Sequence, residues 1–273
     1  MISISNIGWD AELDDSVSSI LVENGINFID IAPSKYFFNP CNVTSADILK
    51  VKSYWVEKEI QPLGMQALLF GTNGLNIFGN QEIQEKLLMH LSYICKIGRE
   101  LGAKKLVFGS PKNRDRSHLT DLESKKIAVD FFIQLGELAQ RYGVVICLEP
   151  NPKCYDSNFM TDSFETAMIV EAVNSDSIRM QLDTGAMQIN NEPPRSIIKD
   201  FSHLIHHIHI SEPQLVPLIP NNSYHSEVSE SLIKFLPNIP MTIEMLTSSK
   251  KNALEEITRS IRLVKEVYKG EMR

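Results

Sequence analysis

The chain repeats one pattern from end to end: a short apolar run, then a longer stretch whose apolar residues have helical spacing. Short apolar runs bounded by turn residues are typical of buried strands, whereas apolar residues three and four positions apart are typical of amphipathic helices. The pattern occurs eight times without a low-complexity linker, which favours parallel βαβ units in one domain over two domains. Strands are expected at residues 2–7, 28–32, 65–70, 105–108, 144–149, 178–183, 206–209 and 241–244, and helices at 14–24, 45–60, 81–101, 122–142, 163–173, 194–201, 227–235 and 254–268.

Eight strand and helix pairs are the number that closes a (β/α)₈ barrel, and 273 residues are an ordinary length for such a domain. The main alternative is an open doubly wound sheet. That fold usually carries a GxGxxG turn after its first strand, and this chain has no such turn there. The sequence therefore predicts an α/β protein with a single (β/α)₈ TIM barrel domain over residues 1–273.

Four successive strands in the second half of the chain end in side chains that bind metals: Glu149, Asp183, His209 and Glu244. The carboxyl ends of barrel strands lie together, and catalytic groups come from that end. Three carboxylates buried together would repel one another unless a cation lay among them. Three carboxylates and one imidazole suit Mn²⁺, Mg²⁺ or Co²⁺ better than a structural zinc, although Zn²⁺ is also allowed. One divalent ion is therefore expected.

Each of these four residues also has an ordinary structural interpretation. Glu149 could pair with a lysine, and Asp183 could cap the next helix through Thr184 and Gly185. His209 could be a satisfied core histidine, and Glu244 an ordinary charge at a strand end. Their occurrence together, at one end of four successive strands, favours the metal site.

The same strand ends resemble the xylose isomerase-like barrel superfamily, most of all its sugar isomerases and epimerases of the ketose 3-epimerase type. The matching motifs are Leu-Glu-Pro at Glu149, Leu-Asp-Thr-Gly at Asp183, Ile-His-Ile-Ser-Glu at His209 and Ile-Glu-Met at Glu244. The resemblance implies a sugar or sugar-phosphate substrate and a metal held by all four residues. It also implies that Glu149 and Glu244 pass a proton, as base and acid, through a metal-stabilised enediolate. A dehydratase on the same site and a barrel that binds sugar without catalysis are the alternatives.

The chain departs from that family in its expected substrate pocket. Epimerases of this type usually carry a histidine three residues after the aspartate, where this chain has Ala186, and often an arginine after the seventh strand, where it has Leu215. The DNA-repair branch, endonuclease IV, needs further histidines for a three-zinc site, which Ala186 and the run Gln-Ala-Leu-Leu-Phe at 66–70 do not supply. DNA repair is therefore not expected. The substrate is instead expected to carry a negative charge or a large extra group.

Substrate contacts are predicted on the loops beside these strand ends. Lys112 and Arg114 follow the fourth strand and could meet a phosphate or carboxylate, although a solvated basic loop is an equal interpretation. Glu212 lies on the loop after the seventh strand. His207 shares a strand face with His209 by alternation, either as a further substrate contact or, more simply, as a core partner.

The charge balance is acidic, with a net charge of −7, which argues against a general affinity for nucleic acid. No apolar run approaches the roughly 18 residues of a membrane span, and the N-terminus lacks the basic and apolar regions of a signal peptide. The four cysteines have no CxxC spacing, which suits a reducing compartment. A cytoplasmic protein without a membrane partner is expected. Its aromatic loop at 36–38 could form an apolar wall over the metal, a core contact or a homodimer contact.

Overall fold

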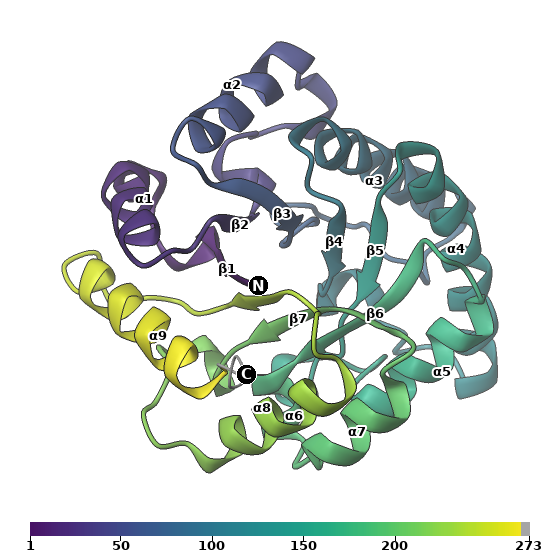
Figure 1. Ribbon diagram of the computed structural model, residues 1–273. Helices are drawn as coiled ribbons and strands as arrows, with labels where there is room; N and C mark the ends of the chain where they lie inside the picture. The colour runs from purple at the N-terminus through teal and green to yellow at the C-terminus, as the bar shows by residue number, and fades with distance from the viewer. Residues whose placement is uncertain (269–273) are drawn as a thin grey trace.

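Parallel strands form a closed eight-stranded barrel in the computed structural model, which describes residues 1–268 (Figure 1). Each strand pairs with its neighbour in sequence, and the first strand pairs with the eighth to close the barrel. The predicted (β/α)₈ barrel is therefore confirmed. The strands are β1 (Ile2–Ser5), β2 (Phe28–Ile31), β3 (Gln61–Met65), β4 (Lys105–Phe108), β5 (Val145–Leu148), β6 (Ile178–Asp183), β7 (Ile205–Ile210) and β8 (Met241–Ile243).

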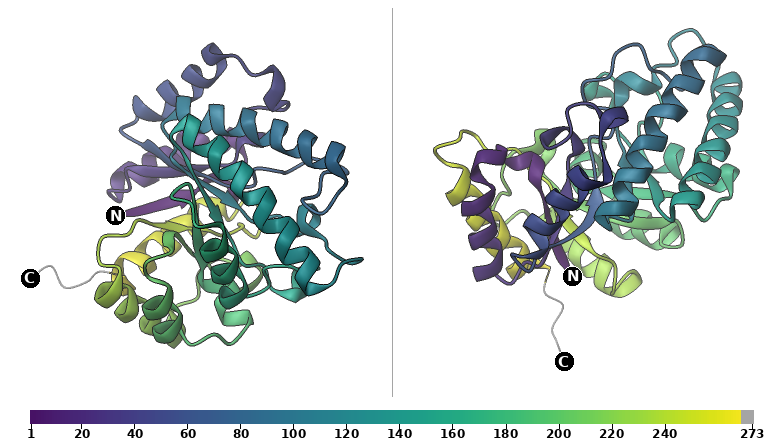
Figure 2. Two further views of the ribbon diagram at one scale, coloured as in Figure 1. Left: turned by 90° about the vertical axis from the view of Figure 1, so that its right-hand side faces the viewer. Right: turned by 90° about the horizontal axis from the view of Figure 1, so that it is seen from above.

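Helices cover the outside of the barrel, as Figures 1 and 2 show. Several begin or end where the sequence supplies a cap. Thr44 and Thr120 form capping boxes, and Gly102 and Gly143 take left-handed conformations directly after the helices that end at Leu101 and Tyr142. The helices are α1 (Asp14–Glu23), α2 (Ser45–Val56), α3 (Gln81–Leu101), α4 (Asp121–Tyr142), α5 (Ser163–Val173), α6 (Thr184–Ile189), α7 (Pro194–Phe201), α8 (Ser223–Phe235) and α9 (Ala253–Val267).

The third strand lies earlier than the sequence predicts. The apolar run at 65–70 is expected as the strand, but β3 occupies Gln61–Met65 and pairs there with β2 and β4. The chain leaves the sheet after Met65, since Ala67 takes a left-handed conformation with φ of 54°. Residues 68–70 are apolar but line a cavity at the mouth of the barrel instead of pairing in the sheet. The prediction of this strand was wrong because an apolar run at a cavity has the same composition as a buried strand.

Two smaller differences lie next to the strand ends. The first strand stops at Ser5, where a 3₁₀ turn over Asn6–Gly8 begins, two residues before the predicted end. A short helix, α6, starts directly after Asp183 and was not predicted as a separate element. Both differences place a short helical segment directly after a strand at the mouth of the barrel.

The barrel interior beneath the strand ends is polar. Asp30, His207 and Thr242 are fully buried there, together with Ser3 and Gln181. His206 directly precedes the inward-facing His207 in sequence and is exposed, as strand alternation requires. An apolar layer packs between the strands and the helices. The side chains predicted to bind a metal therefore lie above a polar floor in a barrel that is apolar outside its strands.

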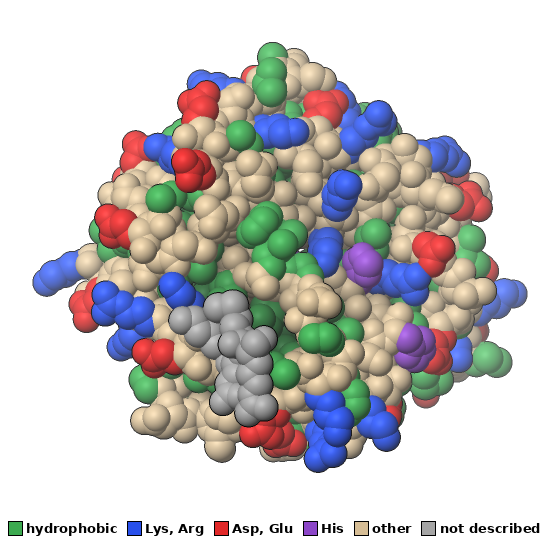
Figure 3. All heavy atoms as spheres, viewed as in Figure 1, with side chains coloured by type: hydrophobic (Ala, Val, Ile, Leu, Met, Phe, Trp, Pro, Cys, Tyr) green, Lys and Arg blue, Asp and Glu red, His purple; other side chains and the backbone are tan. Residues whose placement is uncertain are grey.

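The two ends of the barrel differ in role. The N-terminus lies at the end where the strands begin (Figure 2), and Figure 3 shows this end, with acidic and basic side chains interspersed around its rim. The carboxyl ends of the strands, and so the site, face the other way. Within residues 1–268, every helix is too short or too polar to cross a membrane.

Candidate metal centre

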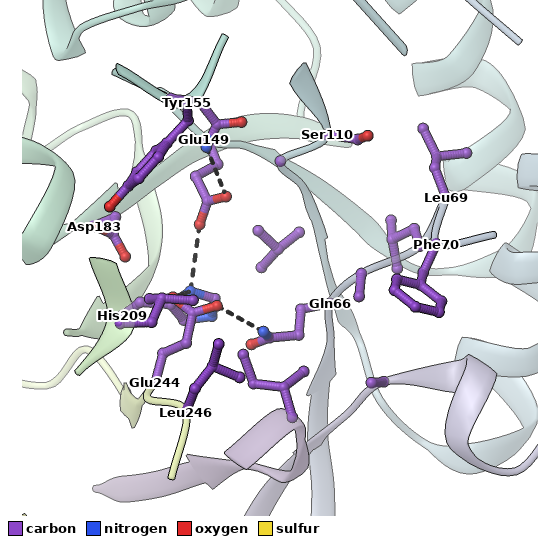
Figure 4. Close-up of a pocket in the computed structure, with 18 of the residues that line it drawn as sticks. Gln66, Leu69, Phe70, Ser110, Glu149, Tyr155, Asp183, His209, Glu244 and Leu246 are labelled. Carbon is purple, nitrogen blue, oxygen red and sulfur yellow. Dashed lines mark hydrogen bonds and ion pairs between the residues drawn. The ribbon is translucent and has the colours of Figure 1, made fainter. Parts of the chain in front are cut away.

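The ends of β5, β6, β7 and β8 bring the four predicted ligands together. Glu149 and Glu244 directly follow β5 and β8, Asp183 ends β6, and His209 is the penultimate residue of β7. One ligand atom from each residue lies within 4.8 Å of the others. Figure 4 shows all four side chains pointing into one cavity. The fold therefore assembles the cluster that the strand-end pattern predicts.

His209 lies between the two glutamates. Its Nδ1 is 3.3 Å from Glu149 Oε1 and 3.1 Å from Glu244 Oε2. Burial would lower the pKa of His209, but the surrounding carboxylates, Glu244 foremost, raise that pKa well above its usual value. The protonated Nδ1 thus lies between the two glutamate carboxylates, and a cation would be attracted to the same place.

The cluster carries more acidic than basic groups. Burial, followed by the charges of Glu244 and Glu149, raises the pKa of Asp183 well above its usual value. This shift means that the three carboxylates resist being ionised together in the absence of a cation. A divalent ion would neutralise the excess charge, and three carboxylates with one imidazole would leave coordination positions free for small oxygen ligands. The residues present therefore fit a divalent ion.

Asp183 has two roles in the structure. Its Oδ1 accepts a 2.6 Å hydrogen bond from the backbone N–H of Ala186, so that it caps α6. Its Oδ2 accepts a 2.8 Å bond from the Ser211 hydroxyl. The helix cap and the metal ligand are alternatives in the sequence, but the capping carboxylate also lies beside the other three predicted ligands, so one side chain can serve as both.

A buried arginine, Arg114, holds the chain around Glu149 by hydrogen bonds. The Nη1 of Arg114 donates a 2.7 Å bond to the Glu149 carbonyl, and Nη2 bonds to Asn151 Oδ1. The amide of Asn151 in turn donates to Glu149 Oε2 over 3.3 Å. The neighbouring strand end carries Gly109, where an added Cβ would lie 1.9 Å from Glu149 Oε2. Glycine is therefore required at 109 to leave room for this carboxylate.

The sequence did not reveal two polar partners of the cluster, Gln66 and Asp30. The Gln66 amide donates a 2.7 Å bond to Glu244 Oε1. Asp30 lies 2.6 Å from His207 Nε2 and 3.8 Å from His209 Nε2, so it approaches both imidazoles from below. The one available signal was a carboxylate inside the otherwise apolar strand Phe-Ile-Asp-Ile.

A cavity of about 910 Å³ opens above the cluster (Figure 4). Its floor includes all four predicted ligands. Tyr155 and Ala186 line it beside Asp183, and Glu212 also lies on its wall. The carboxylate of Glu212 is nonetheless engaged, because it accepts from the Ile219 N–H at 2.9 Å and lies 3.2 Å from His225 Nε2.

Three residues expected to contact substrate lie elsewhere. Lys112, Arg114 and His207 are not among the described residues that line the cavity. Arg114 is fully buried, and two of its guanidinium nitrogens donate hydrogen bonds to Glu149 and Asn151. His207 is fully buried against Asp30. Both make contacts within the protein in place of the substrate contacts that the sequence suggested.

The fold and the cluster together define a (β/α)₈ barrel with a candidate metal centre built from four successive strand ends. The chain belongs to the xylose isomerase-like TIM barrel family, whose model matches residues 20–265. The resemblance seen in the motifs is thereby confirmed. No curated protein matches the chain in sequence.

Several solved structures share the fold. D-psicose 3-epimerase from Clostridium cellulolyticum H10, solved with D-tagatose, is 15% identical with a TM-score of 0.80, covering 98% of this chain and 99% of that one. L-ribulose 3-epimerase is 16% identical with a TM-score of 0.76, covering 100% and 99%. The IOLI protein with a bound zinc atom is 18% identical with a TM-score of 0.72, covering 98% and 99%. At these identities the likeness concerns the fold.

Proposed function

We propose that this protein is a divalent-metal-dependent sugar epimerase or isomerase, which moves a proton on a carbon next to a carbonyl group. The observation that carries the proposal is the placement of Glu149 and Glu244 on either side of His209, at the floor of one cavity. A barrel that only bound sugar would not need a carboxylate on each side. The psicose and ribulose epimerases among the structural neighbours support the same reaction class.

Glu149, Asp183, His209 and Glu244 would hold one divalent ion. Mn²⁺, Co²⁺ and Mg²⁺ suit this oxygen-rich set, and the zinc in one structural neighbour supports Zn²⁺ as well. When bound, the ion would polarise the substrate carbonyl and stabilise the negative charge left by removal of a proton. The protein's own part is to bring two carboxylates to the carbon that reacts.

Glu149 and Glu244 are the proposed proton carriers, and their surroundings differ. Each glutamate has one carboxylate oxygen near His209 and one that accepts a hydrogen bond from a side-chain amide. Glu149 Oε2 accepts from Asn151 over 3.3 Å, while Glu244 Oε1 accepts from Gln66 over 2.7 Å. Two carboxyl groups in different environments can take different protonation states, so that one removes a proton while the other returns one. Return to the same carbon gives an epimer, and return to the neighbouring carbon gives an isomer.

The remaining predicted residues take supporting places in this proposal. Arg114 positions Glu149 through its carbonyl and through Asn151. His207 holds Asp30 beneath His209. Glu212 shapes the cavity wall, and Lys112 follows two wall residues on the same loop. A cytoplasmic location and a homodimer remain proposals.

Deuterium incorporation from solvent tests the proposed function. Chelator-treated protein is reloaded with Mn²⁺, Co²⁺, Mg²⁺ or Zn²⁺ and incubated in deuterated water with a panel of free and O-substituted ketoses. We expect deuterium at a carbon next to the carbonyl, and its loss when chelator is added. The proposal is contradicted if every reloaded form leaves every ketose unlabelled.

A further inference from the structure

Four apolar residues line the cavity that opens above the cluster. They are Leu68, Leu69 and Phe70 from the loop after β3 and Leu246 from the loop after β8, and we refer to these four residues as the apolar shelf. Figure 4 shows Leu69 and Phe70 across the cavity from Asp183 and Tyr155. A ligand whose polar end reached the cluster would therefore meet the apolar shelf with its other end.

The apolar shelf is partly exposed at the mouth of the cavity. Leu68 and Leu69 are buried, but Phe70 is 75% exposed and Leu246 is 48% exposed at the mouth of the cavity. Exposed single apolar residues are common on proteins, whereas apolar side chains that line a cavity beside a few polar groups are typical of a ligand pocket. The burial of Phe70 by a ligand would remove this apolar surface from water.

The loop after β3, which carries three residues of the apolar shelf, is stabilised by backbone hydrogen bonds. Ala67 is in the left-handed region with φ of 54°, a conformation that costs free energy for a residue with a Cβ. Backbone hydrogen bonds from Phe70 N to Ala67 O, and from Thr72 N to Leu69 O, both 3.1 Å, stabilise the turn. Gln66, which precedes Ala67, bonds to Glu244. Gln66 thus links this loop to one of the proposed proton carriers.

The cavity offers little to an anionic substituent. Lys35 is the one lysine or arginine among the described residues that line it. Its ammonium group donates to the Trp9 carbonyl, and the nearby charges of Asp10 and Asp14 favour its charged form. Burial lowers the pKa of Lys35. This lysine is already engaged with the protein, and the side chains of the apolar shelf cannot bond a sugar hydroxyl or a phosphate.

We propose that the substrate is a hydroxy-ketone with an apolar substituent, such as an aromatic ring, at the end remote from its carbonyl, and that the apolar shelf binds this substituent. The inference rests on the proposed function for the position of the carbonyl end. A volume of about 910 Å³ lies in the range of about 300–1,000 Å³ found for pockets that enclose drug-sized ligands. It therefore leaves room for a ring beside a sugar-like head.

Three ligands with the same head distinguish the possible substituents: D-fructose, 6-O-benzyl-D-fructose and D-fructose 6-phosphate. Their dissociation constants for the Mn²⁺-loaded protein are measured by calorimetry, and solvent deuterium exchange is followed in parallel. We expect the benzyl ketose to bind about ten-fold or more tightly than D-fructose, since burial of an aromatic ring is worth at least that much. Its heat-capacity change of binding should also be more negative.

Two serine substitutions locate the binding surface. Phe70→Ser should remove most of the benzyl preference, whereas Phe38→Ser changes a fully exposed phenylalanine that does not line this cavity and should keep it. The inference is overturned if the benzyl ketose fails to bind, binds within about two-fold of D-fructose, or binds more weakly than the phosphate. It is also overturned if the two variants lose the preference equally.

The proposed function and the substrate class can fail separately. If the benzyl ketose binds more tightly in a Phe70-dependent way but no ligand exchanges deuterium, the substrate class stands and the proton-transfer function fails. If D-fructose exchanges deuterium and the benzyl ketose shows no advantage in binding, the function stands and the substrate class fails.

Discussion

Gln66 and Glu244 are joined by a 2.7 Å hydrogen bond, although 178 positions separate them in the chain. The bond runs from the Gln66 amide to Glu244 Oε1, and it connects the loop after β3 to the end of β8 across the mouth of the barrel. It leaves Glu244 Oε2 as the oxygen beside His209. The orientation of one proposed proton carrier therefore depends on a residue that is neither a metal ligand nor an acid.

Loss of the Gln66 amide should slow proton exchange. In Gln66→Leu, the Glu244 carboxylate loses its fixed donor, and groups that orient metal ligands typically contribute about 10- to 100-fold in activity or metal affinity. Solvent deuterium exchange and metal titration measure the effect. Gln134→Leu, on the exposed face of α4, is the matched control and should behave as wild type. Unchanged exchange in Gln66→Leu would show that the bond has no role in orienting Glu244.

Gly109→Ala should disturb the site more than the fold. The added Cβ would lie 1.9 Å from Glu149 Oε2, so the carboxylate must move away from its place beside His209. Metal affinity and proton exchange should fall, while the thermal midpoint changes little. Gly98→Ala is the contrasting variant, because its Cβ would press on Ala103 O and Leu106 in the core, away from the site. It should lower the midpoint and leave metal affinity near that of wild type.

Asp183→Asn and Asp183→Ala should separate the two roles of this residue. Asparagine keeps an oxygen that can accept from Ala186 N but lacks the charge, so metal affinity should fall while α6 stays capped. Alanine removes both functions and should also lower the thermal midpoint. Calorimetry with Mn²⁺ and thermal unfolding of the metal-free variants measure the two effects. Equal midpoints for the two variants would show that the cap contributes no stability.

Glu212 should contribute stability that is lost in acid. Burial would raise its pKa, but the hydrogen bond from His225 and the Ile219 N–H outweigh burial and hold the pKa below the usual 4.5. A carboxyl group with a lowered folded-state pKa stabilises the fold above its unfolded-state pKa. That stability disappears as the pH falls through the lowered value.

Urea unfolding at about pH 7 and about pH 3.5 measures this contribution. Wild type should lose more free energy of unfolding between the two pH values than Glu212→Gln, since the variant has no carboxyl group to protonate there. Glu227→Gln, on α8, is an exposed control and should lose as much as wild type. An equal loss in wild type and Glu212→Gln would contradict the lowered pKa.

The strand ends were predictable from sequence because each combines two local signals. A short apolar run predicts a buried strand, and the abrupt change to Glu149, Asp183 or His209 marks where the chain reaches the barrel mouth. Parallel connectivity then brings these ends to one face without any knowledge of side-chain packing. The barrel and the four-residue cluster follow from patterns that span only a few residues each.

The supporting contacts could not be predicted in the same way. Asp30 meets His207 across the barrel, and Gln66 meets Glu244 across its mouth, and no local pattern encodes either pair. Arg114 has the composition of a basic surface loop, but its 3₁₀ turn directs the guanidinium beneath Glu149. Residues 68–70 were read as a strand for a similar reason. Apolarity predicts burial, but it does not say whether a sheet or a ligand provides it.

Glu149→Gln and Glu244→Gln should each abolish most proton exchange without unfolding the protein. Glutamine keeps the size of the side chain and much of its hydrogen bonding but cannot take up the proton, and loss of a general base typically lowers a rate by about 10² to 10⁴-fold. Each glutamate is also a proposed metal ligand, so the rates must be compared at saturating metal. The metal-free variants should melt at or above the wild-type midpoint, because each removes one carboxylate from a crowded buried cluster. Deuterium incorporation from solvent into a ketose and thermal unfolding of the same samples check both expectations. If both variants are folded, metal-saturated and as fast as wild type, the two glutamates serve only as ligands.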